Sequence, residues 1–188
     1  MSVLSYFAKD AIGYESLDRR AKILALLMIF AIGGIFGFIY EEIFYYIDLG
    51  YLVKRGTTFG PWIPIYGFGA LLIHTAAYDL RKRPFVVFLA SAAGCGLLEF
   101  FTGHLLFHLK GVRLWDYNVE IWNWGNIGGY VCARSVIFFG LSGLLLVYPV
   151  MPLIMWAHET LKPKMVFFLS AIPAGLFILD IVISSIVR

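Results

Sequence analysis

The stretch from Arg55 to Gly69 reads Arg-Gly-Thr-Thr-Phe-Gly-Pro-Trp-Ile-Pro-Ile-Tyr-Gly-Phe-Gly, and it decides how the rest of the chain can fold. Its two prolines and four glycines disfavour an ordinary helix, yet strongly apolar segments flank it on both sides. Free backbone N–H and C=O groups are tolerated at membrane depth only where protein or a water-filled cavity satisfies them. We therefore expect a rigid loop that dips into the membrane boundary with the other helices packed around it. A plain interfacial turn before the second span is the alternative.

The composition indicates a membrane protein. Of 188 residues, 61% are hydrophobic and 14% are charged, and the mean hydropathy is +0.83. Soluble domains carry about 25% charged residues, and apolar runs long enough to cross a bilayer recur along this chain. The sequence predicts an all-α polytopic protein with a single transmembrane domain over residues 1–188. The net charge of +3 is small and its basic residues lie mostly in loops, which favours membrane topology over nucleic-acid binding.

Cysteine and histidine give no sign of a cofactor or a metal site. Cys95 and Cys132 both fall in apolar segments, where buried free thiols are expected rather than a disulfide. His104 and His108 share one helix face, but Glu99, the nearest further donor, lies on another face. We therefore expect no metal and no cofactor.

The apolar runs predict five transmembrane helices, preceded by an N-terminal interfacial segment over residues 1–22. The expected spans cover about residues 23–46, 64–78, 84–109, 127–150 and 165–187. In the first span Gly33 and Gly37 form a small-residue pair with Glu41 one turn further on the same face, so this face should pack against another helix. The second span is short, so part of the Gly/Pro-rich loop is expected to make up the missing depth.

The distribution of Lys and Arg predicts the orientation. Nine lie on the side of the N-terminus and five on the other side, which places the N-terminus in the cytoplasm. In that topology Glu41, Glu99, Arg134 and Asp180 all fall in the outer half of their helices, at the level of the Gly/Pro-rich loop. Each ionisable residue inside a membrane costs roughly 2.5–3.5 kcal/mol on insertion scales. Four at one depth indicate a shared polar site.

Several short motifs together resemble one family. The set comprises Tyr40-Glu41, Arg55-Gly56, Gly60-Pro61, Pro64-Ile65-Tyr66-Gly67, Gly69, Leu98-Glu99, Thr102-Gly103, Trp115-Asp116-Tyr117, Asn126, Gly129 and Cys132. The combination resembles the CmpB-type integral membrane family, whose name refers to ABC transporter permeases and to which a set of small animal transmembrane proteins is also similar. The resemblance covers about residues 24–145. The chain departs from the family pattern at Phe139, where Trp is usual, and at Arg134, where an acidic residue is common.

The resemblance implies a transport component in a bacterial cytoplasmic membrane. No Gly-x-x-x-x-Gly-Lys-Ser/Thr loop is present, so ATP hydrolysis would need an ATPase partner or another membrane subunit. The leading hypothesis is a small permease-like or solute-binding membrane protein with an outward-facing polar pocket for a small polar or anionic solute, in contact with membrane lipid. Its predicted substrate-binding residues are Glu41, Arg55, Tyr66, Glu99, Thr102, Asp116, Tyr117 and Asn126.

Two other functions remain open. An integral-membrane enzyme could act on a lipid or lipid-linked headgroup at the outer leaflet, with Glu41, Glu99 and Asp116 as candidate bases and Arg55 as an anion anchor. In an accessory subunit, the same polar residues would serve only to hold the helices together.

Arg134 needs a partner because a guanidinium does not lose its proton. It lies roughly 10 Å deep in the fourth span, and Asp180 lies roughly 12 Å deep in the fifth, by helical rise. Helices adjacent in sequence tend to pack side by side. We therefore predict a structural Arg134–Asp180 ion pair, with Glu99 as the second choice of partner.

Overall fold

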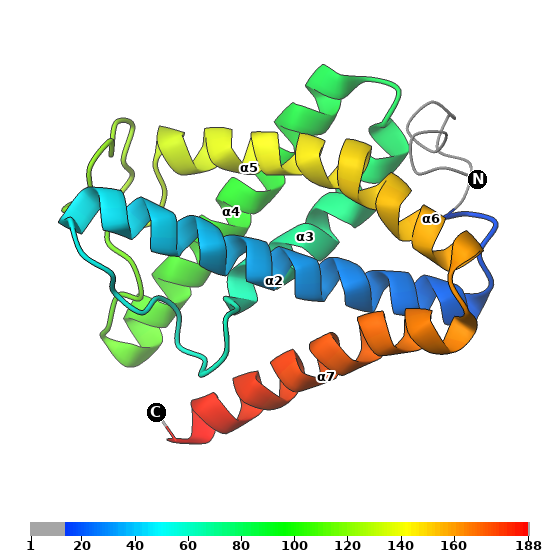
Figure 1. Ribbon diagram of the computed structural model, residues 1–188. Coiled ribbons are helices and arrows are strands. Elements are labelled where there is room, and N and C mark those ends of the chain that lie inside the picture. The colour runs from blue at the N-terminus through cyan, green and yellow to red at the C-terminus, as the bar shows by residue number, and fades with distance from the viewer. Residues whose placement is uncertain (1–13, 188) are drawn as a thin grey trace.

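The computed structural model describes residues 14–187, and every regular element in that range is a helix (Figure 1). In chain order these are α2 (Arg19–Leu49), α3 (Pro64–Ala77), the 3-10 turn η1 (Tyr78–Leu80), α4 (Pro84–Lys110), α5 (Ala133–Leu145), the π-helical turn η2 (Leu146–Val150), α6 (Met151–Thr160) and α7 (Pro163–Val187). Of the predicted interfacial segment 1–22, residues 1–13 lie outside the described residues. From Arg19 onward this segment is the start of α2, which Asp18 caps by accepting from the Ala21 N–H at 2.7 Å.

Four helices of the described chain are long and apolar enough to cross a membrane. They are α2, α4, α7 and the continuous helix Ala133–Thr160 that α5, η2 and α6 form together. The protein is thus an all-helical membrane protein, but the predicted count of five spanning helices is too high by this criterion. The second predicted span, α3, has 14 residues. It extends about 21 Å, which is less than the hydrocarbon core of about 30 Å.

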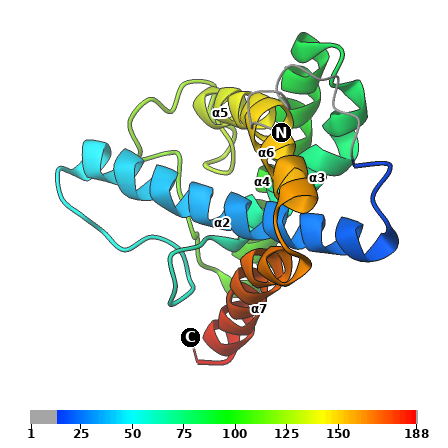
Figure 2. The ribbon, with the colours of Figure 1, turned by 45° about the vertical axis from the view of Figure 1, so that its right-hand side comes forward.

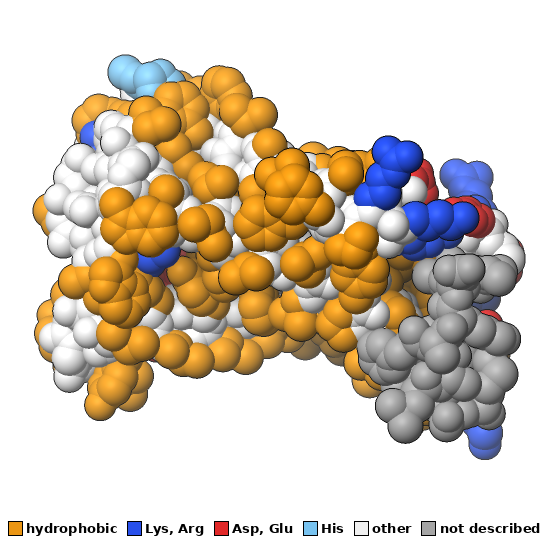
Figure 3. All heavy atoms as spheres, turned by 90° about the horizontal axis from the view of Figure 1, so that it is seen from above, with side chains coloured by type: hydrophobic (Ala, Val, Ile, Leu, Met, Phe, Trp, Pro, Cys, Tyr) orange, Lys and Arg blue, Asp and Glu red, His pale blue; other side chains and the backbone are white. Residues whose placement is uncertain are grey.

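The molecular surface has the pattern that a bilayer requires. Hydrophobic side chains cover most of the face seen in Figure 3, and most of its Lys and Arg side chains gather at the end where α2 begins. Large apolar side chains are exposed on the outer faces of α4 and α7, among them Phe85, Phe101, Leu109, Phe168 and Leu179. Such extensive apolar exposure indicates a surface that faces lipid.

The Gly/Pro-rich loop lies against the bundle, at the depth of the middle of α2. The Ile63 N–H donates to the carbonyl oxygen of Gly34 at 3.0 Å, and Gly34 is the midpoint of α2. The buried Thr58 hydroxyl donates to the Trp62 carbonyl oxygen at 2.6 Å, which satisfies part of the loop backbone. The chain therefore runs back along half of α2 before α3 begins, as Figures 1 and 2 show.

The continuous helix Ala133–Thr160 differs from the fourth predicted span at both ends. It begins six residues later than residue 127, because Gly128 and Gly129 adopt positive φ angles and Ile127 pairs with Val131 in an isolated antiparallel bridge. It continues ten residues beyond residue 150, because the π-helical turn accommodates Pro149 within the helix.

The Asp180 side chain links α7 to the Gly/Pro-rich loop through hydrogen bonds. Its carboxylate accepts from the Phe59 N–H at 2.9 Å, the Gly60 N–H at 2.6 Å and the Trp62 indole N–H at 2.7 Å. The prediction that Asp180 pairs with Arg134 is therefore wrong. The carboxylate instead accepts from one indole N–H and from two backbone N–H groups of a loop in which no helix or sheet bonds them.

Replacing Asp180 with asparagine is expected to loosen this loop. The side-chain amide of Asn offers one acceptor oxygen to three donors, so the free energy of unfolding should fall by about 1.5–3 kcal/mol, the range of hydrogen bonds to charged groups. Amide hydrogen exchange at Phe59 and Gly60 should accelerate. Ser185→Ala, at an exposed position of the same helix, is the control. Unchanged exchange at both amides in Asp180→Asn would contradict this role.

Candidate functional site

The polar side chains inside the bundle gather around two neighbouring cavities. The smaller has a volume of about 30 Å³ and lies between α2, α3, α4, α5 and the loop before α5. The larger has a volume of about 450 Å³ and lies between residues 54–57, the start of α3, the second half of α4 and residues 113–115. Glu41, Ile65 and Trp115 line both, so the two cavities adjoin.

Glu99 lies beside the smaller cavity and is closed off from the surface. It is 5% exposed, and its two carboxyl oxygens lie 2.6 Å from the Tyr117 hydroxyl and 2.8 Å from the Ser135 Oγ. Burial in the folded loop and the adjacent Glu99 raise the pKa of Tyr117 well above its usual range, so its phenol stays protonated and donates. The hydroxyls from the loop and α5 thus join both elements to α4.

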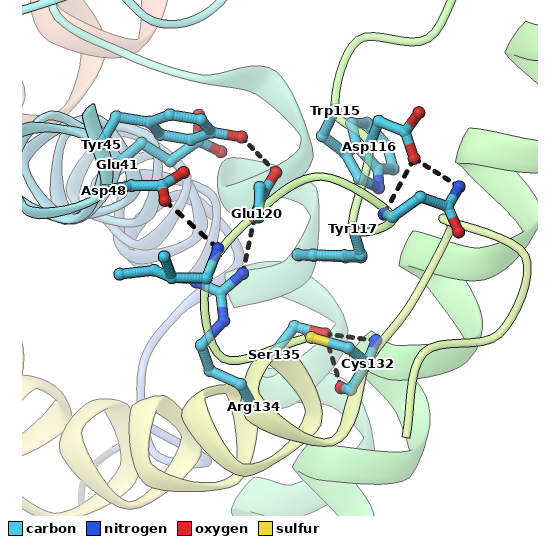
Figure 4. A network of polar contacts seen from close by, with 12 residues as sticks. Glu41, Tyr45, Asp48, Trp115, Asp116, Tyr117, Glu120, Cys132, Arg134 and Ser135 are labelled. Carbon is cyan, nitrogen blue, oxygen red and sulfur yellow. Dashed lines mark hydrogen bonds and ion pairs between the residues drawn. The ribbon is translucent and has the colours of Figure 1, made fainter. Parts of the chain in front are cut away.

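Glu120 is the partner of Arg134. The Arg134 Nη2 lies 2.6 Å from the Glu120 Oε2, with side chains 12% and 4% exposed, and the guanidinium lies 3.7 Å from the centre of the Phe44 ring. The Tyr45 hydroxyl donates to the other oxygen of Glu120 (Figure 4). Both the first and second choices of partner predicted for Arg134 are therefore wrong, because the loop before α5 folds inward and supplies a nearer carboxylate.

Glu41, which lines both cavities, forms an ion pair with Arg55, which lines the larger one. The Arg55 Nε lies 3.1 Å from the Glu41 Oε2, and the guanidinium stacks 3.6 Å above the Tyr45 ring. The backbone N–H of Arg55 donates to Glu42 at 2.8 Å, which ties the start of the Gly/Pro-rich loop to α2. The contact with Glu41 is made through the guanidinium Nε.

Cationic and apolar side chains line the larger cavity together. Lys54, Arg55 and Arg113 contribute three positive charges to its lining, where Glu41 is the one carboxylate; Arg113 also lies 3.7 Å from the carboxylate of Asp116, outside the lining. Arg113 is held by a hydrogen bond to the Gly128 carbonyl oxygen at 2.8 Å, and its guanidinium packs over two aromatic rings. Apolar residues of α3 and α4 also line it, including Phe68, Leu98 and Leu106. The cavity is therefore suited to an anion that also has an apolar part.

Comparison with known families identifies the chain. A family model described as "Putative ABC-transporter type IV", ABC_trans_CmpB, matches residues 28–185. The chain belongs to this family. The match includes α7 and Asp180, beyond the region 24–145 over which the motifs show the resemblance. No curated protein and no solved structure matches the chain. The ABC-transporter family name and the apolar helices together fit a transport-related membrane protein.

Six of the eight predicted substrate-binding residues of this CmpB-family chain lie at the cavities. The smaller cavity is lined by Glu41, Tyr66, Glu99 and Tyr117, and the larger by Glu41, Arg55 and Thr102. Asp116 and Asn126 line neither. Asp116 accepts from the Asn118 side chain at 2.6 Å, and Asn126 donates to the same side chain at 2.8 Å, so both brace the loop instead.

Three charged residues that line the cavities of this CmpB-family chain are not among the residues predicted from the sequence. Lys54 and Arg113 flank the loops and were counted only for topology. Glu120 was overlooked, although its apolar neighbours Val119 and Ile121 suggest a carboxylate drawn inward. Within residues 14–187, no group of three His, Cys, Asp or Glu side chains could hold a metal ion. Both cysteines are free and buried.

Proposed function

We propose that this CmpB-family protein is a permease-like membrane component that binds an anionic solute in its larger cavity. The observation that carries the proposal is the convergence of Lys54, Arg55 and Arg113 on one cavity of about 450 Å³. That volume falls within the roughly 300–1,000 Å³ of small-molecule sites. Arginine is suited to phosphate and carboxylate because its planar guanidinium can donate two parallel hydrogen bonds.

The cavity opens on the outer side of the membrane in this proposal. The basic clusters at the start of α2, around residues 81–83 and at residues 162–164 lie at the opposite end of the bundle (Figure 1). The positive-inside rule assigns that end to the cytoplasm, together with the N-terminus. An ATPase or another membrane subunit would dock there. The loop and α3 together then make a fifth crossing, of which the helix supplies about 21 Å.

A second candidate is an integral-membrane enzyme that acts on a lipid or lipid-linked headgroup. The apolar wall of the larger cavity favours it, because Phe68 is 54% exposed and could contact an acyl chain. Glu41 is its candidate base, because it borders the cavity beside Arg55. Conversion of a headgroup by the purified protein in liposomes would favour the enzyme. Reversible binding of an unmodified anion would favour the permease-like component.

The proposal predicts a charge-dependent affinity. In a thermal-shift screen of the purified protein against organic phosphates and carboxylates, at least one anion should raise the unfolding temperature. Arg55→Gln and Arg113→Gln should each weaken its binding about tenfold or more, as loss of a charged hydrogen bond implies. Lys110→Gln removes an exposed charge outside the cavity and should change the affinity less than twofold. Failure of every anion to bind the folded wild type would refute the proposal.

A further inference from the structure

Glu99 is a buried carboxyl group that anion binding in the larger cavity does not use. Its hydrogen-bond partners are the hydroxyls of Tyr117 and Ser135. Two guanidinium groups lie near the small cavity, and each forms an ion pair with another carboxylate. Arg55 pairs with Glu41, and Arg134 pairs with Glu120. Burying a carboxylate without a cation carries a large desolvation penalty, and the protonated form does not carry it.

The hydrogen atoms around Ser135 distinguish the two forms of Glu99. The Ser135 Oγ lies 2.8 Å from the Glu99 Oε2, 2.9 Å from the Cys132 carbonyl oxygen and 3.3 Å from the Cys132 N (Figure 4 shows the Cys132–Ser135 contacts). A serine hydroxyl has one hydrogen to donate and two lone pairs to accept with. If Glu99 is ionised, the single hydrogen of Ser135 can be donated either to the Glu99 Oε2 or to the Cys132 carbonyl oxygen. The other of these two close contacts then has no hydrogen. If Glu99 is protonated, it donates to Ser135 and Ser135 donates to Cys132, so every close contact has its hydrogen.

The charges around Glu99 also favour the neutral form. The titratable and charged groups around it are Tyr40, Glu41 and Tyr45 from α2, Tyr66 from α3, Cys95 from its own helix, Tyr117 and Glu120 from the loop, and Arg134 from α5. Two of these are carboxylates, which repel a further negative charge. The single cation among them is held 2.6 Å from Glu120.

We propose that Glu99 is a proton-binding site, protonated at neutral pH, next to the anion cavity. The small cavity of about 30 Å³ is lined by both Glu99 and Glu41. It exceeds the roughly 10–15 Å³ that one water molecule needs. Glu41 in turn lines the larger cavity, so a water molecule and Glu41 give the proton a route between Glu99 and that cavity. This inference goes beyond anion binding and does not depend on it.

Infrared spectroscopy tests the proposal without a ligand. The purified protein, in an ester-free detergent at pH 7, should show the carbonyl-stretch band of a protonated carboxylic acid, shifted by ¹³C labelling of the Glu carboxyl groups. Glu99→Gln should remove that band. This variant is expected to fold, because its amide can donate to Ser135 and accept from Tyr117 as the protonated acid does. Glu41→Gln is the matched control and should keep the band.

Two results would overturn the proposal. One is the absence of a difference between wild type and Glu99→Gln in this spectral region, because Glu99 would then be ionised. The other is loss of the band in Glu41→Gln alone, because the proton would then be on Glu41. If Glu99→Gln yields no folded protein, Ser135→Ala decides. It should move the band to higher wavenumber by removing the acceptor of the Glu99 proton, and an unmoved band would overturn the proposal.

Discussion

Arg134→Gln is expected to lower the free energy of unfolding by about 3–5 kcal/mol, the usual cost of removing one partner from a buried ion pair. The Glu120 carboxylate would lose its contact with Arg134 and keep a hydrogen bond from Tyr45, while its side chain is 4% exposed. The substitution also removes the guanidinium that packs 3.7 Å from the Phe44 ring centre and so bridges the loop to α2. The lost ion pair and the lost ring contact both weaken the packing of α5 against the loop and α2.

Denaturant unfolding of the protein in detergent measures this effect. Arg83→Gln, at an exposed position before α4, is the matched control and should change the free energy of unfolding by less than about 0.5 kcal/mol. In Arg134→Gln combined with Glu120→Gln, the loss should be smaller than the sum of the single losses, because neither buried charge is then unpaired. A loss in Arg134→Gln no larger than in Arg83→Gln would show that the pair does not stabilise the protein.

The partner of Arg134 could not be predicted from the sequence. Helical rise gives the depth of a residue, and it gives similar depths for Arg134 and Asp180. It gives neither the rotation of each helix about its axis nor the path of a loop that folds inward. Glu120 comes from such a loop. The partners of Asp180 include the backbone N–H groups of Phe59 and Gly60, and backbone groups are the same in every non-proline residue.

The Gly/Pro-rich loop could be anticipated because its constraint is local. Prolines and glycines disfavour a helix wherever the chain goes, and apolar flanks hold the segment at the membrane. The end of the fourth span could not be anticipated in the same way. Pro149 indicates a helix end in a soluble protein, whereas here a π-helical turn keeps the helix continuous to Thr160. The cluster of Glu41, Tyr66, Glu99 and Tyr117 was predicted as part of one pocket, and side-chain packing divides the predicted pocket into two cavities.

Gly37→Leu is expected to lower the free energy of unfolding by about 3 kcal/mol, at the upper end of the range for overpacked interiors. A Cβ atom at Gly37 would lie 2.0 Å from the Cγ of Tyr66 and 2.4 Å from its Cβ. The backbone fixes the position of the Tyr66 Cβ, so no rotamer change can move that atom away and α3 itself must shift. One turn earlier, a Cβ at Gly33 would lie 2.8 Å from the Tyr66 carbonyl oxygen, which shows that the backbones of α2 and α3 are in close contact.

Gly175→Leu in α7 is the control for this prediction. A Cβ at Gly175 meets no atom within 4 Å, so the same substitution adds a side chain on an open helix face. It should leave stability unchanged or raise it by up to about 1 kcal/mol, because leucine favours a helix more than glycine does. Denaturant unfolding of both variants in one detergent gives the comparison. Equal stability of the two variants would mean that α2 and α3 are not held in contact, and that Tyr66 is not fixed beside the small cavity by this packing.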